Sequence, residues 1–314
     1  MVLEMEFYHE GFFGYSLEKD FYYWSWAHFI PIILLIGAIL LTYFFRNKLR
    51  DWKGEETFRF VLGGILIFLE AFYYWRLLYV GNSGDGDVPL TFLPLQVCEW
   101  SAYIAAFMLM KKSRSGFEIC YYITLTLGII PFFMPAVIEY TGPSYAKYYQ
   151  FWIEHTLPIY GVFYMMFVHG FKPSYKKVWK PLAVLTAMVI PAIILNGKIE
   201  GANFMYLAEG TAGDSIANIL PQNIWVRLLL YVGIIAVLFT LVSLPQIITQ
   251  AKERKRTGKK GKKDLKKSKK MPAAKEQVKE KASFDTVVEK EKSPSVDKPY
   301  EFDSEPTFEI IDDE

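Results

Sequence analysis

Seven long stretches of this sequence carry almost no charge. They are rich in Leu, Ile, Phe and Tyr and cover residues 27–45, 58–80, 90–110, 117–138, 150–169, 178–196 and 223–249. A transmembrane helix needs about 20 mostly apolar residues, because each residue advances the helix by about 1.5 Å. The pattern therefore predicts an all-α, multi-pass membrane protein with seven transmembrane helices. The third and fifth stretches are the least uniform, so we expect them to be shielded from lipid on some faces.

The charges of the loops predict how the helices are oriented. Lysine and arginine gather in residues 46–57, 111–116 and 170–180, whereas residues 81–89 and 197–222 carry more acidic than basic side chains. Loops rich in Lys and Arg stay in the cytoplasm. We therefore expect a protein of the cell membrane with its N-terminus outside and its C-terminus in the cytoplasm.

Composition divides the chain into three parts. Residues 1–26 are acidic and aromatic, which is typical of an extracellular segment at a membrane surface. Residues 27–249 form the predicted seven-helix membrane domain. Residues 250–314 contain few large apolar side chains and are predicted to be a disordered cytoplasmic tail, because such a segment cannot bury enough surface to fold alone.

Charge is unevenly distributed within the predicted tail. Residues 252–270 hold 12 Lys or Arg against two acidic residues, and residues 301–314 are acidic with no basic residue. Each basic residue near an anionic membrane contributes about 1 kcal/mol of binding. We therefore expect the basic run to contact anionic lipid head groups, in preference to RNA or a soluble partner, and we expect no nucleic acid. The acidic segment is a candidate docking motif for a cytoplasmic protein.

Ionisable side chains inside the predicted spans are candidates for a functional site, because a charge at the bilayer centre costs ~2.5–3.5 kcal/mol on insertion scales. They are Glu70 and Arg76 in the second span, Glu99 in the third, and Glu154 and His155 in the fifth. In the predicted orientation all but Glu70 lie in the outer half of the membrane. We expect one outward-facing polar pocket, with separate buried hydrogen bonds as the alternative.

Residues 91–100, TFLPLQVCEW, bring several polar side chains into the third span. At about 100° per residue, Gln96, Glu99 and Tyr103 fall on one face of a helix. Pro94 is expected in the first turn, where its missing N–H costs little. Cys98 points away from the polar face, which favours a packed side chain over a nucleophile.

Two kinds of chemistry are compatible with these residues. His155 is a candidate general base, because an unperturbed imidazole titrates near neutral pH. Glu70 and Glu99 are candidates for carrying protons in a coupled transporter. The sequence has no paired-histidine or paired-cysteine metal spacing, no phosphate-binding loop and no nucleophile elbow, so we expect no metal and no cofactor.

The chain resembles the bacterial YwaF family of integral membrane proteins. The matching pieces are WSWAHFIPIILL at residues 24–35, LPLQVC at 93–98, EH at 154–155, GFKPSYKKVWK at 170–180 and LNGKIEGANFMYL at 195–207. The resemblance extends from about residue 20 to residue 249 and excludes the tail. It implies a membrane domain without a settled biochemical role.

The YwaF proteins are distantly similar to a vertebrate group of transmembrane acyltransferases that act on phospholipids and pair a cysteine with a histidine. That group reads Pro-Cys-His where this chain reads Pro94-Leu95-Gln96, so the position of the nucleophile is Leu95 here. The resemblance implies that His155 matches the histidine. Cys98 replaces the missing cysteine only if the backbone unwinds at Pro94.

The sequence therefore predicts a membrane protein that binds or modifies a lipid or another amphiphile, with phospholipid acyl transfer as the candidate reaction. The predicted catalytic residues are His155, Glu99 and Cys98, and the predicted substrate-binding residues are Arg76, Gln96, Tyr103, Asn196, Asn203 and Tyr206. Arg76 is expected to hold an anionic head group. Two alternatives stay open: a proton-coupled solute transporter or permease subunit using Glu70 and Glu99, and a receptor or assembly factor without catalytic activity.

Overall fold

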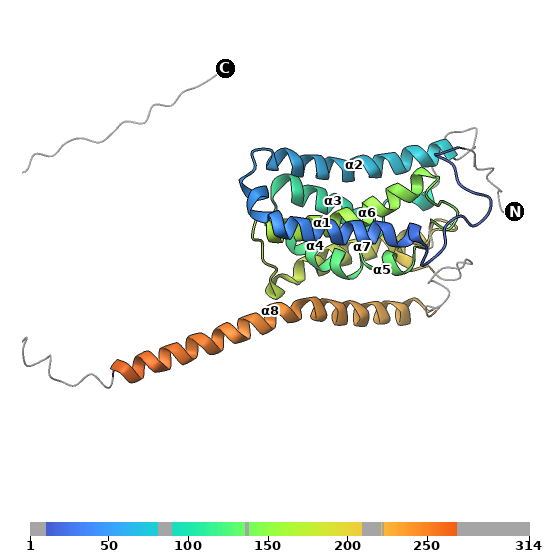
Figure 1. Cartoon of the computed structure of the whole chain (residues 1–314). Coiled ribbons are helices and arrows are strands. Elements are labelled where there is room, and N and C mark those ends of the chain that lie inside the picture. Colours follow the sequence, from blue (N-terminus) through green and yellow to red (C-terminus); the bar gives the residue numbers. More distant parts are fainter. Residues whose placement is uncertain (1–10, 81–89, 136–137, 209–220, 222, 269–314) are drawn as a thin grey trace, which may run out of the picture. The chain divides into compact units, whose positions relative to one another are not determined.

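The computed structural model describes residues 11–80, 90–135, 138–208, 221 and 223–268, and every regular element in these ranges is a helix (Figure 1). The protein is therefore all-α, as the sequence predicts. The elements are α1 (Trp26–Asp51), α2 (Glu55–Val80), η1 (Leu90–Phe92), α3 (Val97–Lys111), α4 (Arg114–Thr126), α5 (Ile130–Phe133), α6 (Ala146–Phe167), η3 (Tyr175–Lys177), α7 (Trp179–Asn196), η4 (Phe204–Tyr206) and α8 (Ile224–Ser268).

Five helical segments of the described chain are long and apolar enough to cross a membrane. They comprise Trp26–Asp51, Glu55–Leu78, Arg114–Phe133, Tyr175–Asn196 and Ile224–Lys252. Five of the seven predicted spans therefore have a matching helix. The other two correspond to α3 and α6, which occupy the third and fifth predicted spans. Neither helix meets the combined requirement of length and hydropathy for crossing a membrane.

α3 and α6 are the interior helices of the bundle. α3 packs against α2, α4 and α6, and α6 packs against α1, α2, α3 and α4. Polar side chains on an interior helix face protein rather than lipid, so such a helix tolerates more of them than a lipid-facing helix does. α3 is also short: its 15 residues span roughly 22 Å, less than the ~30 Å hydrocarbon core of a bilayer. These enclosed positions explain the uneven hydropathy of the two segments.

The third predicted span differs from the structure at its start. The short helix η1 is followed by a non-helical stretch, and α3 begins only at Val97, with Gln96 as an extended N-cap residue (φ −90°, ψ 151°). The capping box explains this start, because the Glu99 carboxylate accepts the N–H of Gln96, while Pro94 disfavours helical backbone at Leu93 before it. The prediction that Pro94 lies in the first turn of a helix is therefore wrong. Gln96 precedes the helix that carries Glu99 instead of sharing its face.

Small side chains on α3 bring α2 close to it. Ala102, Ala105 and Ala106 are almost completely buried. Gly63 of α2 faces this surface, since a Cβ added there would lie 2.8 Å from Cγ of Met110 and 3.1 Å from the carbonyl oxygen of Ala106. Small residues are typical of helix interfaces in membranes because they let two backbones approach closely.

Replacing Gly63 with leucine is expected to destabilise the protein by about 1–3 kcal/mol, because overpacking forces the two helices apart. The adjacent Gly64 is a matched control, since a Cβ added there meets no neighbouring atom within 4 Å. Gly64→Leu should change the free energy of unfolding by no more than about 0.5 kcal/mol. Unfolding of the detergent-purified variants measures both values. Equal effects of the two substitutions would contradict the close approach of α2 and α3.

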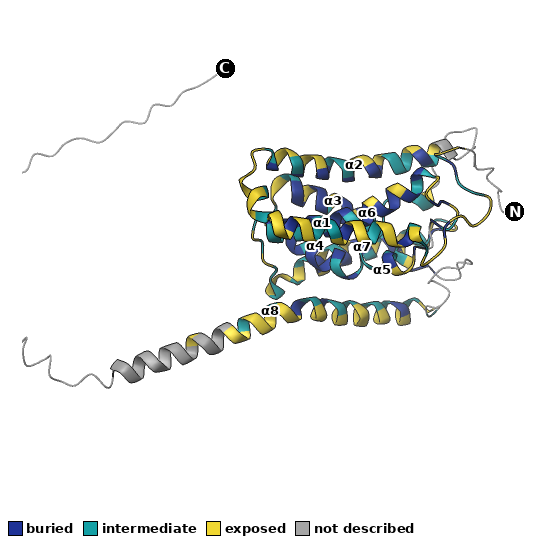
Figure 2. Cartoon of the chain, viewed as in Figure 1, coloured by how far each residue is buried: buried dark blue, intermediate teal, exposed yellow. Residues whose placement is uncertain are grey.

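The outward faces of α1, α2 and the described part of α8 are exposed (Figure 2). Large side chains such as Leu34 and Phe44 on α1, Phe68 on α2, and Trp225 and Leu229 on α8 are exposed. Extended exposed apolar surface marks contact with a membrane or a partner. Together with the lengths of the helices, it identifies a multi-pass membrane protein.

The segment before α1 packs against the chain between α5 and α6. The N–H of Asp20 donates to the carbonyl oxygen of Glu139 at 2.9 Å, and the Asp20 carboxylate accepts from the N–H of Gly142 at 3.2 Å. The Lys19 ammonium donates to the Glu139 carboxylate at 2.8 Å, and this hydrogen bond raises the pKa of Lys19. Residues 11–25 of the predicted surface segment are therefore bonded to the helix bundle.

The last helix extends beyond the predicted end of the membrane domain. The chain forms two compact units, Met1–Ala251 and Lys252–Glu314, and α8 continues into the second of them as far as Ser268. The prediction of a chain without regular structure from residue 250 is therefore wrong up to Ser268. Lysine and arginine are good helix formers, and no proline interrupts the basic run there. The acidic segment 301–314 lies outside the described residues.

Candidate functional site

Buried polar side chains from α2, α3 and α6 gather where α2 ends and where α3 and α6 begin (Figure 1). On α2, the Glu70 side chain is 2% exposed and the Arg76 side chain is 7% exposed. Nη2 of Arg76 donates to the carbonyl oxygen of Gly14 at 2.7 Å. Among the described residues no donor group reaches the carboxylate oxygens of Glu70, whose hydrogen-bonding neighbour is the Glu154 carboxyl group, and no acceptor reaches Nε of Arg76. A buried polar atom without a hydrogen-bond partner is unfavourable, so we expect a ligand, a proton or a water molecule to supply the partner.

The first turns of α6 contribute a chain of hydrogen bonds to the same place. Nζ of Lys147 donates to the side-chain oxygen of Gln150 at 2.7 Å, and the Gln150 amide donates to the Glu154 carboxylate. Nζ of Lys147 also lies 4.2 Å from the centre of the Tyr73 ring on α2. The Glu154 carboxylate interacts electrostatically with Glu70, so α6 and α2 face each other through charged groups.

The third contribution comes from the start of α3. Glu99 is 8% exposed, and its carboxylate accepts the N–H of Gln96 at 2.9 Å, which caps the helix. Electrostatic interactions link Glu99 to Glu154 and Lys147 on α6. The charged side chains that gather here are called the polar cluster, and its members are Glu70, Arg76, Glu99, Lys147 and Glu154.

The predicted amide ligands are bound to the loop that follows α7. Asn196 donates to the carbonyl oxygen of Phe204 at 3.0 Å and accepts its N–H at 2.8 Å, and Asn203 accepts the N–H of Ala208 at 3.1 Å. The Gln96 side chain accepts the N–H of Met205 at 3.0 Å. These side chains therefore hold the loop against the start of α3. Their role in binding a substrate stays a prediction.

Arg227 at the start of α8 is a buried charge that the sequence analysis missed. Its side chain is 1% exposed and donates to the carbonyl oxygens of Pro221 at 2.9 Å, Tyr206 at 3.0 Å and Ala208. Tyr206 has a positive φ of 55°, and its own ring is 39% exposed. Arg227 lies in the first turn of a strongly apolar helix. A charge at such a position is the feature of the sequence that could have identified it.

The tautomer of His155 follows from its hydrogen bond. The side chain is 8% exposed, and Nδ1 lies 2.7 Å from the carbonyl oxygen of Phe151. A carbonyl oxygen only accepts, so in the neutral ring Nδ1 carries the proton and Nε2 keeps its lone pair. His28 differs, because its Nδ1 accepts the N–H of Trp24 at 3.0 Å and its Nε2 donates to the carbonyl oxygen of Phe132 at 2.7 Å. Of these two histidines, His155 is the one that retains a basic nitrogen.

The other predicted residues of this region lie beside the polar cluster. Cys98 is partly buried and interacts electrostatically with Glu99 and other acidic members of the cluster. Among the described residues, no hydrogen bond joins Cys98 to His155. Leu95 packs with the apolar side chains of the loop after α7. Tyr103 is 40% exposed on the surface of α3.

The structure therefore brings Glu70 and Glu99 together with Glu154 and adds Lys147 from α6, which interacts electrostatically with Arg76. Tyr103 is 40% exposed but still interacts electrostatically with Glu70, Glu99 and Glu154. A sequence model of the TMEM164 family matches residues 23–243. The chain belongs to the TMEM164 family.

The match to the TMEM164 family covers more than two thirds of the chain and includes every member of the polar cluster. It excludes most of the N-terminal segment and the basic run. Comparison with curated proteins and with solved structures gives no match.

A second charged network joins the opposite ends of the same helices in this TMEM164-family protein. The Glu55 carboxylate accepts from Nε of Arg59 at 2.7 Å, Nε2 of His169 at 2.7 Å and the Tyr164 hydroxyl at 3.1 Å. Nζ of Lys112 lies 3.6 Å from its other oxygen. The network links the start of α2 to the ends of α3 and α6. The spacing of Glu55 and Arg59, four residues apart on a helix, was a signal for it in the sequence.

The chemistry of the polar cluster is that of hydrogen bonding and charge. Within the ranges that the structure describes, no three His, Cys, Asp or Glu side chains are arranged to hold a metal ion. The carboxylates of Glu70, Glu99 and Glu154 accept protons, ammonium groups or hydroxyl groups, whereas Arg76 and Lys147 donate to anions. The site is therefore suited to a ligand that carries both kinds of group.

Proposed function

We propose that this TMEM164-family protein binds a phospholipid or a similar amphiphile, with its head group in the polar cluster. The observation that carries the proposal is the set of buried atoms that no described donor or acceptor reaches: both oxygens of Glu70, which lack a donor, and Nε of Arg76, which lacks an acceptor. A phosphate accepts hydrogen bonds from a guanidinium group and from an ammonium group such as that of Lys147. A hydroxyl or ammonium group of the same head group donates to Glu70.

The proposal also covers the number of transmembrane helices and the direction in which they cross the membrane. In it, α3 and α6 cross the membrane with the five apolar segments, which gives seven transmembrane helices with the N-terminus outside. The polar cluster then faces the outer leaflet of the cell membrane. Basic loops at the opposite ends of the helices support this direction. The narrower resemblance to the bacterial YwaF proteins belongs to the same proposal.

We propose acyl transfer or hydrolysis as the reaction at this site, with His155 as general base. Nε2 of His155 removes the proton from an attacking hydroxyl group or water, which adds to the ester carbonyl carbon. The ester C–O bond then breaks and Nε2 returns the proton to the leaving alkoxide, while Nδ1 stays bonded to the carbonyl oxygen of Phe151. Leu95 stands at the position of the nucleophile in the similar acyltransferases, so the attacking group comes from the substrate or from water. Cys98 has no described hydrogen bond with His155, which supports a route without an acyl-cysteine.

A proton-coupled transporter is the second candidate function. The observation that favours it is the position of Glu70, a buried carboxyl group without a described hydrogen-bond donor that interacts with Glu154 and Glu99. Carboxyl groups that lie close together in an apolar environment tend to share protons. In this case Glu70→Gln abolishes solute uptake, whereas the lipids bound to the protein stay unchanged.

Arg76→Gln is expected to reduce the amount of phospholipid that copurifies with the protein by at least about tenfold, because it removes the buried charge that holds the phosphate. Native mass spectrometry of the protein in a mild detergent measures the bound lipid. Arg46→Gln on α1 is the matched control, because Arg46 is bonded to the carbonyl oxygen of Tyr43, far from the polar cluster. Equal lipid retention by folded Arg76→Gln and Arg46→Gln would contradict the proposal.

A further inference from the structure

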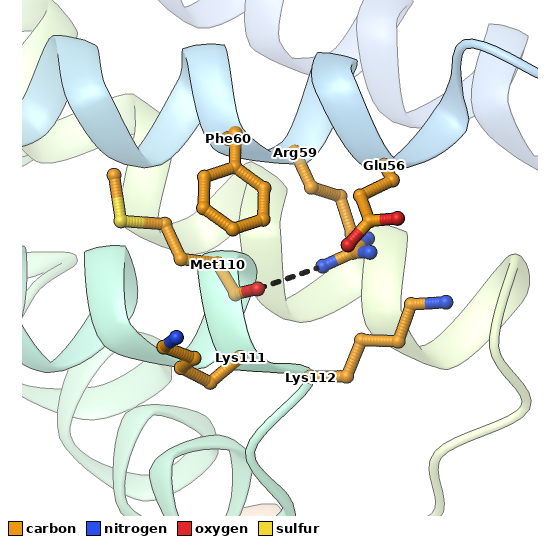
Figure 3. Close-up of a pocket in the computed structure, with 6 residues that line it drawn as sticks. All are labelled: Glu56, Arg59, Phe60, Met110, Lys111 and Lys112. Carbon is orange, nitrogen blue, oxygen red and sulfur yellow. Dashed lines mark hydrogen bonds between the residues drawn. The ribbon is translucent and has the colours of Figure 1, made fainter. Parts of the chain in front are cut away.

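A pocket of about 280 Å³ lies at the opposite end of α2 from the polar cluster. It is open to the surface and lies between the first turns of α2 and the last turn of α3 (Figure 3). Arg59 and Arg76 are 17 residues apart on α2, so roughly 25 Å of helix separates this pocket from the proposed head-group site. The residues that line it are Glu56, Arg59, Phe60, Met110, Lys111 and Lys112.

Arg59 is held rigidly in the wall of this pocket. Its side chain is 1% exposed, Nε donates to Glu55 at 2.7 Å, and Nη1 donates to the carbonyl oxygens of Leu109 and Met110. The remaining nitrogen, Nη2, has no hydrogen-bond partner among the described residues. A guanidinium group fixed in this way has lost its rotational freedom before any ligand arrives, so it binds an anion at a smaller entropic cost.

The lining of the pocket attracts an anion. Arg59, Lys111 and Lys112 supply three positive charges against the carboxylates of Glu56 in the lining and Glu55 behind it, which leaves an excess of one positive charge. The ammonium groups of Lys111 and Lys112 point to opposite sides of the Met110 carbonyl group in Figure 3, and that of Lys112 lies 3.6 Å from the Glu55 carboxylate. Both lysines are exposed, and each has the length and flexibility to reach a bound phosphate.

The polarity of the pocket changes along the helices. Glu56, Arg59 and Lys112 line one side of the pocket, whereas Phe60 and Met110 line the side toward the middle of the bundle, with the Lys111 ammonium group below them. The helices close one turn further in, where Gly63 approaches Met110. The apolar surface then continues on the outside of α2 with the exposed side chain of Val61. A phospholipid standing in a bilayer has the same order of groups, with the head group at the surface and the chains inward.

We propose that this pocket binds the phosphate of an anionic phospholipid of the cytoplasmic leaflet. Its volume is slightly below the ~300–1,000 Å³ of pockets that enclose a drug-sized ligand, so it fits a head group with the acyl chains outside. The predicted cytoplasmic side is also where anionic lipids concentrate. The inference concerns a different site from the polar cluster; it rests on the proposed direction of the spans but not on the proposed binding or chemistry at the cluster.

The test compares two double substitutions that remove the same charge. Lys111→Gln with Lys112→Gln changes the pocket, and Lys176→Gln with Lys177→Gln changes exposed lysines of η3. Each full-length variant is purified in detergent and titrated with phosphatidylglycerol, phosphatidylcholine or inorganic phosphate, and bound lipid is counted by native mass spectrometry. The basic run after residue 251 is present in both variants, so its own attraction for anionic lipid cancels in the comparison.

The pocket variant is expected to bind phosphatidylglycerol at least about tenfold more weakly than the unaltered protein, and the η3 variant less than about twofold more weakly. Glu56→Gln is expected to bind it more tightly, because this substitution removes the one negative charge of the lining. Equal weakening in both double variants would overturn the proposal in favour of unspecific surface attraction. Displacement of the lipid by millimolar inorganic phosphate would overturn it in favour of a soluble phosphate ligand. Thermal unfolding confirms that each variant is folded.

Discussion

Glu55→Ala is expected to lower the free energy of unfolding by about 3–5 kcal/mol, because it leaves the charge of a buried arginine without its partner. The Glu55 carboxylate is the shared acceptor for Arg59, His169 and Tyr164, with distances of 2.7, 2.7 and 3.1 Å. Arg59 is 1% exposed, so its charge is largely shielded from water and depends on this carboxylate. The substitution therefore weakens the attachment of α2 to both interior helices at once.

Glu56→Ala is the matched control for this result. Glu56 is the next residue on α2 and has the same side chain, but it is exposed. Its loss should change the free energy of unfolding by no more than about 0.5 kcal/mol. Denaturant or thermal unfolding of both purified variants gives the comparison. If Glu55→Ala unfolds with the same midpoint as Glu56→Ala, the network does not hold the helices together.

His155→Ala is expected to lower the rate of acyl transfer or hydrolysis by about 10²–10⁴-fold, which is the usual contribution of a general base. The reason is the free lone pair of Nε2, fixed in direction by the bond from Nδ1 to the carbonyl oxygen of Phe151 at 2.7 Å. The measurement is turnover of a labelled phospholipid by the purified protein, combined with whole-cell lipid profiles. The plot of rate against pH for the unaltered protein should include a limb that reflects protonation of His155, and this limb should be absent from the variant.

Cys98→Ala separates this route from a cysteine nucleophile. Cys98 is a partly buried side chain beside the acidic members of the polar cluster, and it has no described hydrogen bond with His155. The variant should keep most of the activity and lose about 1 kcal/mol of stability through the deletion of one small group. An inactive but folded Cys98→Ala beside an active His155→Ala would reverse the assignment and make the protein a cysteine acyltransferase.

The candidate site was accessible from the sequence only in part. Glu70, Arg76 and Glu99 stand out because charges are rare in apolar segments. Lys147 was not identified, because it lies outside the predicted fifth span, yet α6 begins at Ala146 and carries it into the polar cluster. Arg227 was overlooked although it lies within the predicted seventh span, in the first turn of the otherwise apolar part of α8. For Lys147, a boundary shifted by a few residues decides whether the charge counts as buried.

The polar face predicted for residues 96–103 shows how local structure changes a site. A regular helix brings Gln96, Glu99 and Tyr103 to one side. In the structure Gln96 precedes α3 and reaches the loop after α7, Glu99 caps the helix and Tyr103 is on the surface. The break at Pro94 was visible in the sequence, but the partner loop 109 residues away from Gln96 was not.

Hydropathy and loop charge were sufficient to predict an all-α membrane protein, because the lack of water in a bilayer forces each spanning segment to satisfy its own backbone. Only the tertiary structure decided which helices are enclosed. α3 and α6 are the least suited to lipid by composition, and packing against their neighbours removes them from it. The same packing brings Glu70, Glu99 and Glu154 together from three helices and joins Arg59 to α3. Contacts between segments far apart in the chain depend on how side chains fit in space, which periodicity along the sequence does not encode.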